Sequence, residues 1–194
     1  MSIYRAQFEA ALRLLASAFA EVAAAGYGRP VLVGGGAVEY YTGGEITSGD
    51  FDVITPAQKE LERALLKRGF IRPSGPGTPA RGVYHPELDM GVEVVSGILF
   101  DGAADRERVR LVDVGAGEPI PIPAVEDMIA DRMGQFNTRP GGDPAMLRQA
   151  IVLYLIACQD MEYRIDSAYL EKRIRQETNG DYGLAYLTEK ANEA

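Results

Sequence analysis

The chain has 194 residues and a mass of 21.0 kDa, with 20 Lys and Arg against 28 Asp and Glu, a net charge of −8. Hydrophobic residues at 46% and charged residues at 25% are typical of a globular domain and exclude collagen-like, disordered and disulfide-rich classes. The single cysteine, Cys158, excludes an internal disulfide, and the single histidine, His85, excludes sites that need two histidines. The sequence pI of 4.8 argues against broad non-specific binding to nucleic acid, although a local basic groove is compatible with it.

The N-terminal residues do not form a secretory signal, because no basic region is followed there by an apolar core and a small-residue cleavage site. No run of about 18 apolar residues occurs in the sequence either. We therefore expect a cytoplasmic protein with no membrane partner.

The first predicted elements surround a run of three glycines. Residues 4–25 predict an amphipathic helix, since apolar residues recur at spacings of three and four until a terminating glycine. The apolar run 31–33 predicts a buried strand that ends in the glycine turn 34–36. Residues 37–41 leave room for little more than one helical turn.

The next predicted elements alternate strands with a helix. Residues 51–54 predict a strand, and Thr55 is expected to cap a helix that stops at Gly69. Residues 73–82 are rich in Pro and Gly and predict a loop. Further strands are predicted at 91–95, 109–114 and 120–122, and helices at 125–136, after Asp143 and after Asp166.

This order predicts an α+β protein with two parts, a mixed sheet with helices over residues 1–122 and a helical part over residues 123–194.

Asp50, which directly precedes the strand predicted at 51–54, and Asp52 within it are candidates for metal binding. Residues two apart on a strand point to the same face, so Asp50 and Asp52 share one face while Phe51 points to the other. Neighbouring carboxylates repel one another unless a proton or a cation lies between them, and Mg²⁺ prefers such oxygen ligands. The alternative is a solvated strand end without a ligand.

Glu93 is the third candidate, because it is the one acid in the apolar strand 91–95. A buried carboxylate usually needs a partner, so this residue could complete a two-metal cluster with the two aspartates. The alternative is a wet face of an edge strand.

The glycine turn does not match the two best-known nucleotide-binding loops. Gly34 and Gly36 fit the dinucleotide-binding pattern, but its third glycine is replaced by Glu39, and a Walker A loop would need Gly-Lys-Ser/Thr. What remains is a strand, a glycine turn, a short helix and a second strand that carries two aspartates.

This arrangement resembles the nucleotidyltransferase fold superfamily, the DNA-polymerase-β-like minimal transferases. Gly34-Gly35, Asp50-x-Asp52 and Glu93 stand at the places of its Gly-Gly turn, paired acids and third acid. Residues 33–38 and 47–52 look most like the bacterial abortive-infection and toxin–antitoxin branch. The resemblance covers roughly residues 27–160 and implies a nucleotidyltransferase-like mixed sheet flanked by helices.

The resemblance also implies a function, the Mg²⁺-dependent transfer of a nucleoside monophosphate from an NTP to a hydroxyl of RNA (such as tRNA), protein or a small molecule. Asp50, Asp52 and Glu93 would be the catalytic residues and would bind the two metal ions. Five residues would bind the nucleotide phosphates, namely Gly34, Gly35, Ser48, Arg132 and Arg139. A toxin-type enzyme would also have an antitoxin protein as its partner.

The chain departs from the branch at four places. The branch usually has an Arg shortly before the Asp-x-Asp, where residues 43–45 here are Gly-Gly-Glu. The third acid is usually Asp rather than Glu93, the basic residue on the later helix is usually Lys rather than Arg132, and Met146 replaces an expected Asp. Two alternatives therefore stay open: an inactive relative that serves as a binding module or toxin–antitoxin partner, and a structural domain whose three acids do not converge.

Overall fold

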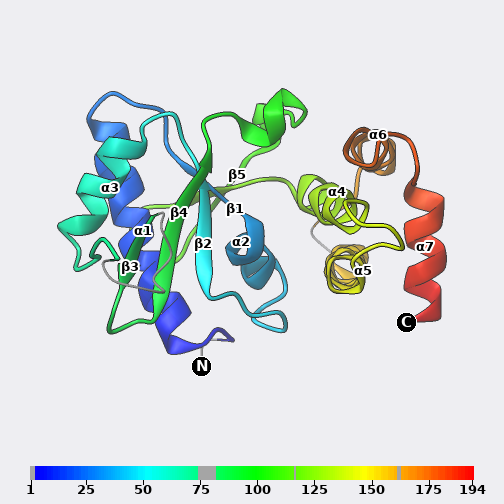
Figure 1. The fold of residues 1–194 in the computed structure, drawn as a ribbon, viewed down its shortest axis with the longest axis horizontal. Helices are drawn as coiled ribbons and strands as arrows, with labels where there is room; N and C mark the ends of the chain where they lie inside the picture. Colours follow the sequence, from blue (N-terminus) through cyan, green and yellow to red (C-terminus); the bar gives the residue numbers. More distant parts are fainter. Residues whose placement is uncertain (1–2, 74–81, 116, 161–162) are drawn as a thin grey trace. The chain divides into compact units, whose positions relative to one another are not determined.

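A computed structural model describes residues 3–73, 82–115, 117–160 and 163–194. Within these residues the chain forms seven α-helices, two short 3-10 helices and six strands (Figure 1). This combination of helices with a small mixed sheet agrees with the predicted α+β class. The chain divides into two compact units. The sheet unit comprises Met1–Leu99 and Val109–Pro123, and the helical unit comprises Phe100–Arg108 and Ala124–Ala194.

The sheet unit contains three helices and all six strands of the described chain. Its helices are α1 (Ala6–Ala24), α2 (Gly34–Tyr41) and α3 (Gln58–Leu66). Its strands are β1 (Val31–Val33), β2 (Asp50–Ile54), β3 (Val83–His85), β4 (Met90–Ser96), β5 (Arg110–Val112) and β6 (Ile120–Ile122). Between β4 and β5 the chain forms the 3-10 helices η1 (Leu99–Gly102) and η2 (Arg106–Arg108), and residues Phe100–Arg108 belong to the helical unit.

The main sheet has the strand order β1-β2-β4-β3. β2 runs antiparallel to β1 and parallel to β4, and β3 runs antiparallel to β4. β5 and β6 form a separate antiparallel pair. The two central strands, β2 and β4, are thus parallel neighbours, which brings together two segments that are 40 residues apart in the sequence.

Helix α1 covers one face of this sheet, and Figure 1 shows α1 and α3 on the side of the strands away from α2. The rings of Phe8 on α1 and Phe51 on β2 lie 5.4 Å apart, and both side chains are fully buried. Because side chains alternate along a strand, Asp50 and Asp52 lie on the opposite face from Phe51. The burial of the phenylalanine therefore sets which face of β2 carries the acids.

Several predicted boundaries differ from the structure. α2 begins at Gly34, so the glycines form its first turn instead of a turn before it. The Thr55 hydroxyl accepts a hydrogen bond from the Ala57 N–H (3.1 Å), and α3 begins only at Gln58, so Thr55 closes a local turn and does not cap the helix. β5 is shorter than predicted.

Strand β3 and helix α7 were not predicted. Most of the predicted loop, residues 74–81, lies outside the described residues, and β3 starts just after it. β3 has only three residues, too few for a visible alternation in the sequence.

The helical unit contains α4 (Val125–Phe136), α5 (Pro144–Gln159), α6 (Ser167–Glu177) and α7 (Leu184–Glu193). Two predicted caps are confirmed, since Asp143 accepts a hydrogen bond from the Ala145 N–H and Asp166 accepts one from the Tyr169 N–H, both at 3.0 Å. α4 packs against both α5 and α6.

Candidate active site

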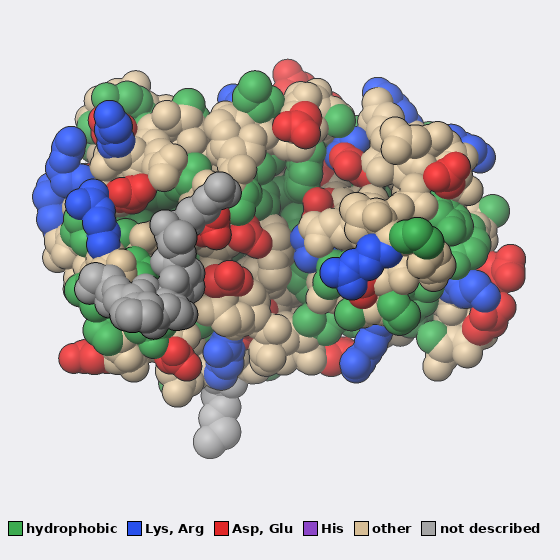
Figure 2. All heavy atoms as spheres, in the orientation of Figure 1, with side chains coloured by type: hydrophobic (Ala, Val, Ile, Leu, Met, Phe, Trp, Pro, Cys, Tyr) green, Lys and Arg blue, Asp and Glu red, His purple; other side chains and the backbone are tan. Residues whose placement is uncertain are grey.

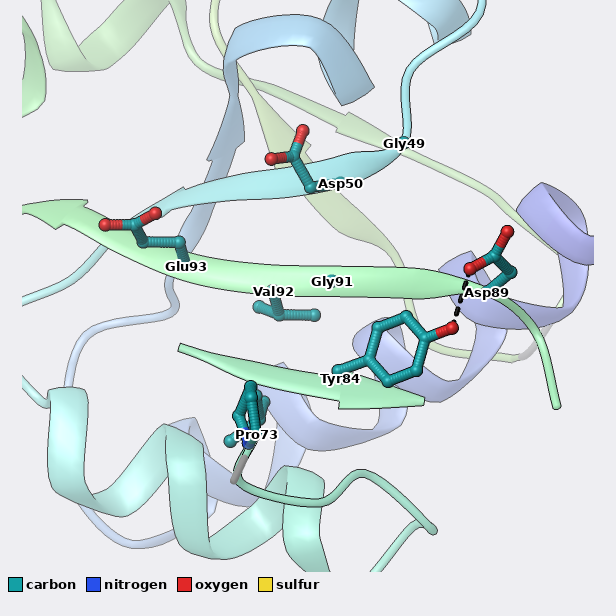
Figure 3. A pocket seen from close by; sticks show the side chains of 9 residues that line it. Gly49, Asp50, Pro73, Tyr84, Asp89, Gly91, Val92 and Glu93 are labelled. Atoms are coloured by element: carbon teal, nitrogen blue, oxygen red, sulfur yellow. Dashed lines mark hydrogen bonds between the residues drawn. The ribbon is translucent and has the colours of Figure 1, made fainter. Parts of the chain in front are cut away.

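The three predicted acids occupy one face of the main sheet. Asp52 is the register partner of Glu93 in the parallel pair of β2 and β4, and Asp50 is the partner of Gly91. Partners in neighbouring strands point to the same face, with strands about 4.8 Å apart. Figure 3 shows Asp50 and Glu93 pointing to the same side of the sheet. The fold thus brings the third acid beside the pair.

The glycine turn lies directly against Asp52. Val33, the last residue of β1, is the register partner of Asp52, so α2 starts beside this carboxylate. Gly34 has φ +62°, a conformation that favours glycine, and a Cβ at this position would collide with Asp52 Oδ2. A Cβ at Gly35 would lie 2.5 Å from the Ser48 Oγ. Both glycines are therefore needed for close packing against the acid-bearing segment.

A pocket of about 490 Å³ opens beside the acids on the side of β3. It is lined by Asp50, Gly91 and Glu93, and by Tyr84 and Asp89 at its far wall (Figure 3). Gly91 stands between Asp50 and Tyr84 across the strands, and its missing side chain leaves room over the sheet. The Tyr84 hydroxyl donates a hydrogen bond to Asp89 Oδ1 (2.6 Å), which raises the pKa of Tyr84.

The Ser48 hydroxyl holds the start of β2. Its Oγ donates to the Asp50 backbone O at 2.8 Å and lies 3.3 Å from Asp50 Oδ1. Ser48 therefore orders the backbone immediately before the two aspartates, in addition to lying against Gly35.

An ion pair between Arg5 and the buried Glu39, which sequence reasoning missed as part of the site, binds the segment before Asp50. The Glu39 side chain is fully buried, and Arg5 binds both of its carboxylate oxygens, at 2.8 and 2.9 Å. Glu39 Oε2 also accepts a hydrogen bond from the Ser48 N–H (2.6 Å), and Arg5 donates to the Ser48 carbonyl. Both backbone groups of Ser48 are thus bound by this Arg5–Glu39 pair.

A sequence signal for this pair was present. Glu39 is the single charged residue within the apolar stretch 37–41, a pattern that indicates a buried acid in need of a partner. Its partner, Arg5, lies 34 residues earlier, and nothing in the sequence specifies that distance.

The three carboxylates lie on one face of the main sheet. Among the described residues, no group of three or more His, Cys, Asp or Glu side chains is arranged to hold a metal ion. The backbone nevertheless brings three oxygen-donor side chains to adjacent positions, and carboxylates are the ligand type that Mg²⁺ prefers. The ligand type and the strand register therefore fit a divalent cation.

The two predicted phosphate-binding arginines belong to the helical unit. Arg132 on α4 is buried, forms an ion pair with Asp131, and lies 3.3 Å from Gln149 Oε1 on α5. Arg139 is exposed and forms an ion pair with Asp143 (3.3 Å). Both guanidinium groups thus have carboxylate partners within their own unit.

The comparisons with known proteins do not identify a family. No protein-family model matches the chain, and no curated protein sequence is significantly similar to it. None of the helices in the described part of the chain combines the length and the apolar character that crossing a membrane requires.

Proposed function

We propose that the sheet unit has a nucleotidyltransferase-like fold and is the catalytic part of a Mg²⁺-dependent nucleotidyltransferase. The enzyme would move a nucleoside monophosphate from an NTP to a hydroxyl acceptor. The observation that carries this proposal is the parallel register of Asp52 with Glu93, with Gly34 packed against Asp52. Three acids and a glycine-initiated helix then lie at one place on the sheet.

The glycine turn supports the phosphate-binding half of the proposal. The first N–H groups of a helix have no partner within the helix, and the N-cap residue of α2, Val33, makes no side-chain hydrogen bond to them. Such N–H groups and the helix dipole favour a bound anion. Gly34 and Gly35 would present these groups to the triphosphate, and Ser48, beside Gly35, would add a hydroxyl.

The acids support the metal-binding half. Asp50, Asp52 and Glu93 would hold Mg²⁺, which when bound neutralises charge on the phosphate oxygens and activates the acceptor hydroxyl. The Arg5–Glu39 pair would keep the segment before Asp50 in place, through its bonds to Ser48. Gly91 would leave room for the acceptor beside Asp50.

A second candidate function is a nucleotide-binding module without catalysis. It is favoured by the absence, within the described residues, of a three-carboxylate group that is ready to hold a metal ion. It would use the glycine turn in the same way and would release no pyrophosphate.

Thermal melts and pyrophosphate release test these two functions together. We expect Mg²⁺ with an NTP to raise the melting temperature of the wild type, because a ligand that binds only the folded state stabilises it. Pyrophosphate should be released when acceptors are supplied as total cellular RNA, protein or small-molecule extract. Asp52→Asn should lose both responses, since it removes one carboxylate charge from the proposed metal-binding set.

Glu87→Gln is the matched control, because Glu87 is an exposed acid of the sheet unit and loses the same charge. It should behave as the wild type does. If the melting temperature of the wild type does not change with Mg²⁺ and any of the four NTPs, both functions are overturned. A Mg²⁺-dependent shift without pyrophosphate release would favour the binding module.

A further inference from the structure

A second pocket of the sheet unit has the opposite charge from the candidate active site. Residues 58–72, which include α3, hold five Lys and Arg residues and two Glu residues, although the whole chain has a net charge of −8. In Figure 2, blue Lys and Arg side chains gather at the left edge, where Figure 1 places α3, and red acidic side chains lie over the sheet. Charge is therefore segregated within this unit.

A groove of about 490 Å³ runs along the exposed side of α3 and is lined by Lys59, Glu62, Arg63 and Arg72. We call it the α3 groove. Lys59 and Arg63 form no ion pair with another residue in the described part of the chain, and both are exposed. Arg72 pairs with Glu62 at 3.2 Å, and its side chain is 68% exposed. The groove thus has excess positive charge that is available to a ligand.

The other two basic residues of the segment have structural partners. Lys67 and Arg68 both bind Glu21 on α1, at 2.5 and 2.9 Å. These contacts connect α3 to α1 and account for those charges. Among the described residues no ion pair accounts for the charges of Lys59 and Arg63, which lie one helical turn apart on the same face.

The α3 groove adjoins the candidate active site. Ile71 exchanges two backbone hydrogen bonds with Tyr84 of β3, at 2.8 and 2.9 Å. This pairing fixes the following residues beside β3, where Arg72 lines the groove and Pro73 lines the pocket of Asp50 and Glu93. The walls of the α3 groove and of the pocket of the acids are therefore joined through consecutive residues of one segment.

We propose that the α3 groove binds the phosphodiester backbone of a single-stranded nucleic acid and directs its terminal hydroxyl toward Asp50 and Glu93. Proteins that bind single strands combine a basic groove with an aromatic ring on which a base stacks. Here Lys59, Arg63 and Arg72 supply the groove, and Tyr84 supplies a ring in the adjoining pocket. An acidic protein would use the cations but would have no need of the ring. The proposal deepens the proposed function, because it identifies the acceptor.

The test measures binding of a fluorescein-labelled 15-nucleotide oligouridine RNA by fluorescence anisotropy, over a series of salt concentrations and without NTP or Mg²⁺. The double variant Lys59→Gln/Arg63→Gln keeps good helix formers at exposed positions, so the fold should persist. We expect it to weaken binding by about tenfold at low salt and to reduce the slope of log K against log salt by about 1.4, the value for two lost phosphate contacts. Arg72→Gln, outside the helix, should weaken binding in the same direction.

The matched control is Arg164→Gln/Lys172→Gln, which removes the same charge from two exposed positions in the helical unit. It should bind as the wild type does. Equal weakening by the two double variants would show a net-charge effect and overturn the groove. Equal competition by poly-glutamate and unlabelled oligouridine would indicate an acidic protein as the partner and would also overturn it.

Failure of the groove and failure of the proposed function give different results. If the protein shows the nucleotide-dependent melting shift and releases pyrophosphate, but its RNA binding does not depend on the groove, only the groove proposal is overturned. If RNA binding depends on the groove, but the melting temperature does not respond to Mg²⁺ and NTP, the groove proposal is supported and the proposed function is overturned.

Discussion

In the sheet unit the buried carboxylate of Glu39 binds the backbone of a loop, whereas in the helical unit the buried carboxylate of Asp127 binds side chains of another helix. Asp127 on α4 accepts hydrogen bonds from Arg173 Nε (2.7 Å) and from the Tyr169 hydroxyl (2.9 Å), both on α6. Burial raises the pKa of the Asp127 carboxyl despite these bonds. Arg173, which is fully buried, also binds Glu177 at 2.6 Å.

The difference separates two uses of a buried charge. Asp127 and Arg173 satisfy each other and connect α4 to α6, so their contacts account for a structural role. Glu39 instead binds the Ser48 backbone, two residues before Asp50, so its contacts determine where a candidate functional residue lies. Burial alone therefore does not distinguish the two roles; the identity of the partner does.

The largest expected effect comes from breaking the Asp127–Arg173 ion pair in the helical unit. Arg173→Met should lower the free energy of unfolding by about 3–5 kcal/mol, because Asp127 would then be a buried charge without its partner. Urea denaturation measures this loss. Arg175→Met is the control, since its ion pair with Glu171 is largely exposed and should contribute at most about 1 kcal/mol. Equal losses in the two variants would contradict a buried structural pair.

The next largest effect is expected at Glu39, where a substitution should change both stability and the response to nucleotide. Glu39→Gln should lower the free energy of unfolding by about 1–3 kcal/mol, because Arg5 and the Ser48 N–H lose a charged acceptor. It should also reduce the Mg²⁺- and NTP-dependent melting shift, since the segment before Asp50 is held less firmly.

The comparison is with Arg173→Met, assayed well below its melting temperature. That variant should keep the nucleotide response even though it is the less stable of the two. If the nucleotide-dependent melting shift decreases only in step with the loss of stability in both variants, a positioning role for Glu39 is contradicted.

The smallest effect concerns an exposed charge of the helical unit. A hydrogen bond from the Tyr169 N–H and a second from Arg108 (2.7 Å) lower the pKa of Asp166 below 3.8. Because its pKa is lower in the folded state, the Asp166 carboxylate stabilises the fold above pH 3.8. This contribution is lost as the pH falls below 3.8, through the pKa of the folded state.

Asp166→Asn tests this contribution, because Asn also caps a helix and the change isolates the charge. The variant should melt at a lower temperature than the wild type at pH 7, and the difference should shrink toward zero below pH 3.8. Melting curves at several pH values measure it. A difference that is independent of pH would contradict the contribution of the charge.

The sequence by itself determined several local features of this protein. Periodicity placed α1, and the side chains of Asp143 and Asp166 placed the starts of α5 and α6, because caps bind backbone N–H groups two or three residues away. Alternation along one strand likewise placed Asp50 and Asp52 on a common face. Each of these features depends on neighbours within one or two turns or along one strand.

Only the tertiary structure decided which distant residues meet. The parallel register of Asp52 with Glu93, the Arg5–Glu39 pair at Ser48, and the pairing of Ile71 with Tyr84 all join different segments. The strand pattern of Glu93 allows either neighbour and either direction, whereas the structure pairs β4 in parallel with β2. Such contacts are set by the burial of the whole core, so the local pattern names the candidate residues while the fold decides which of them form a site.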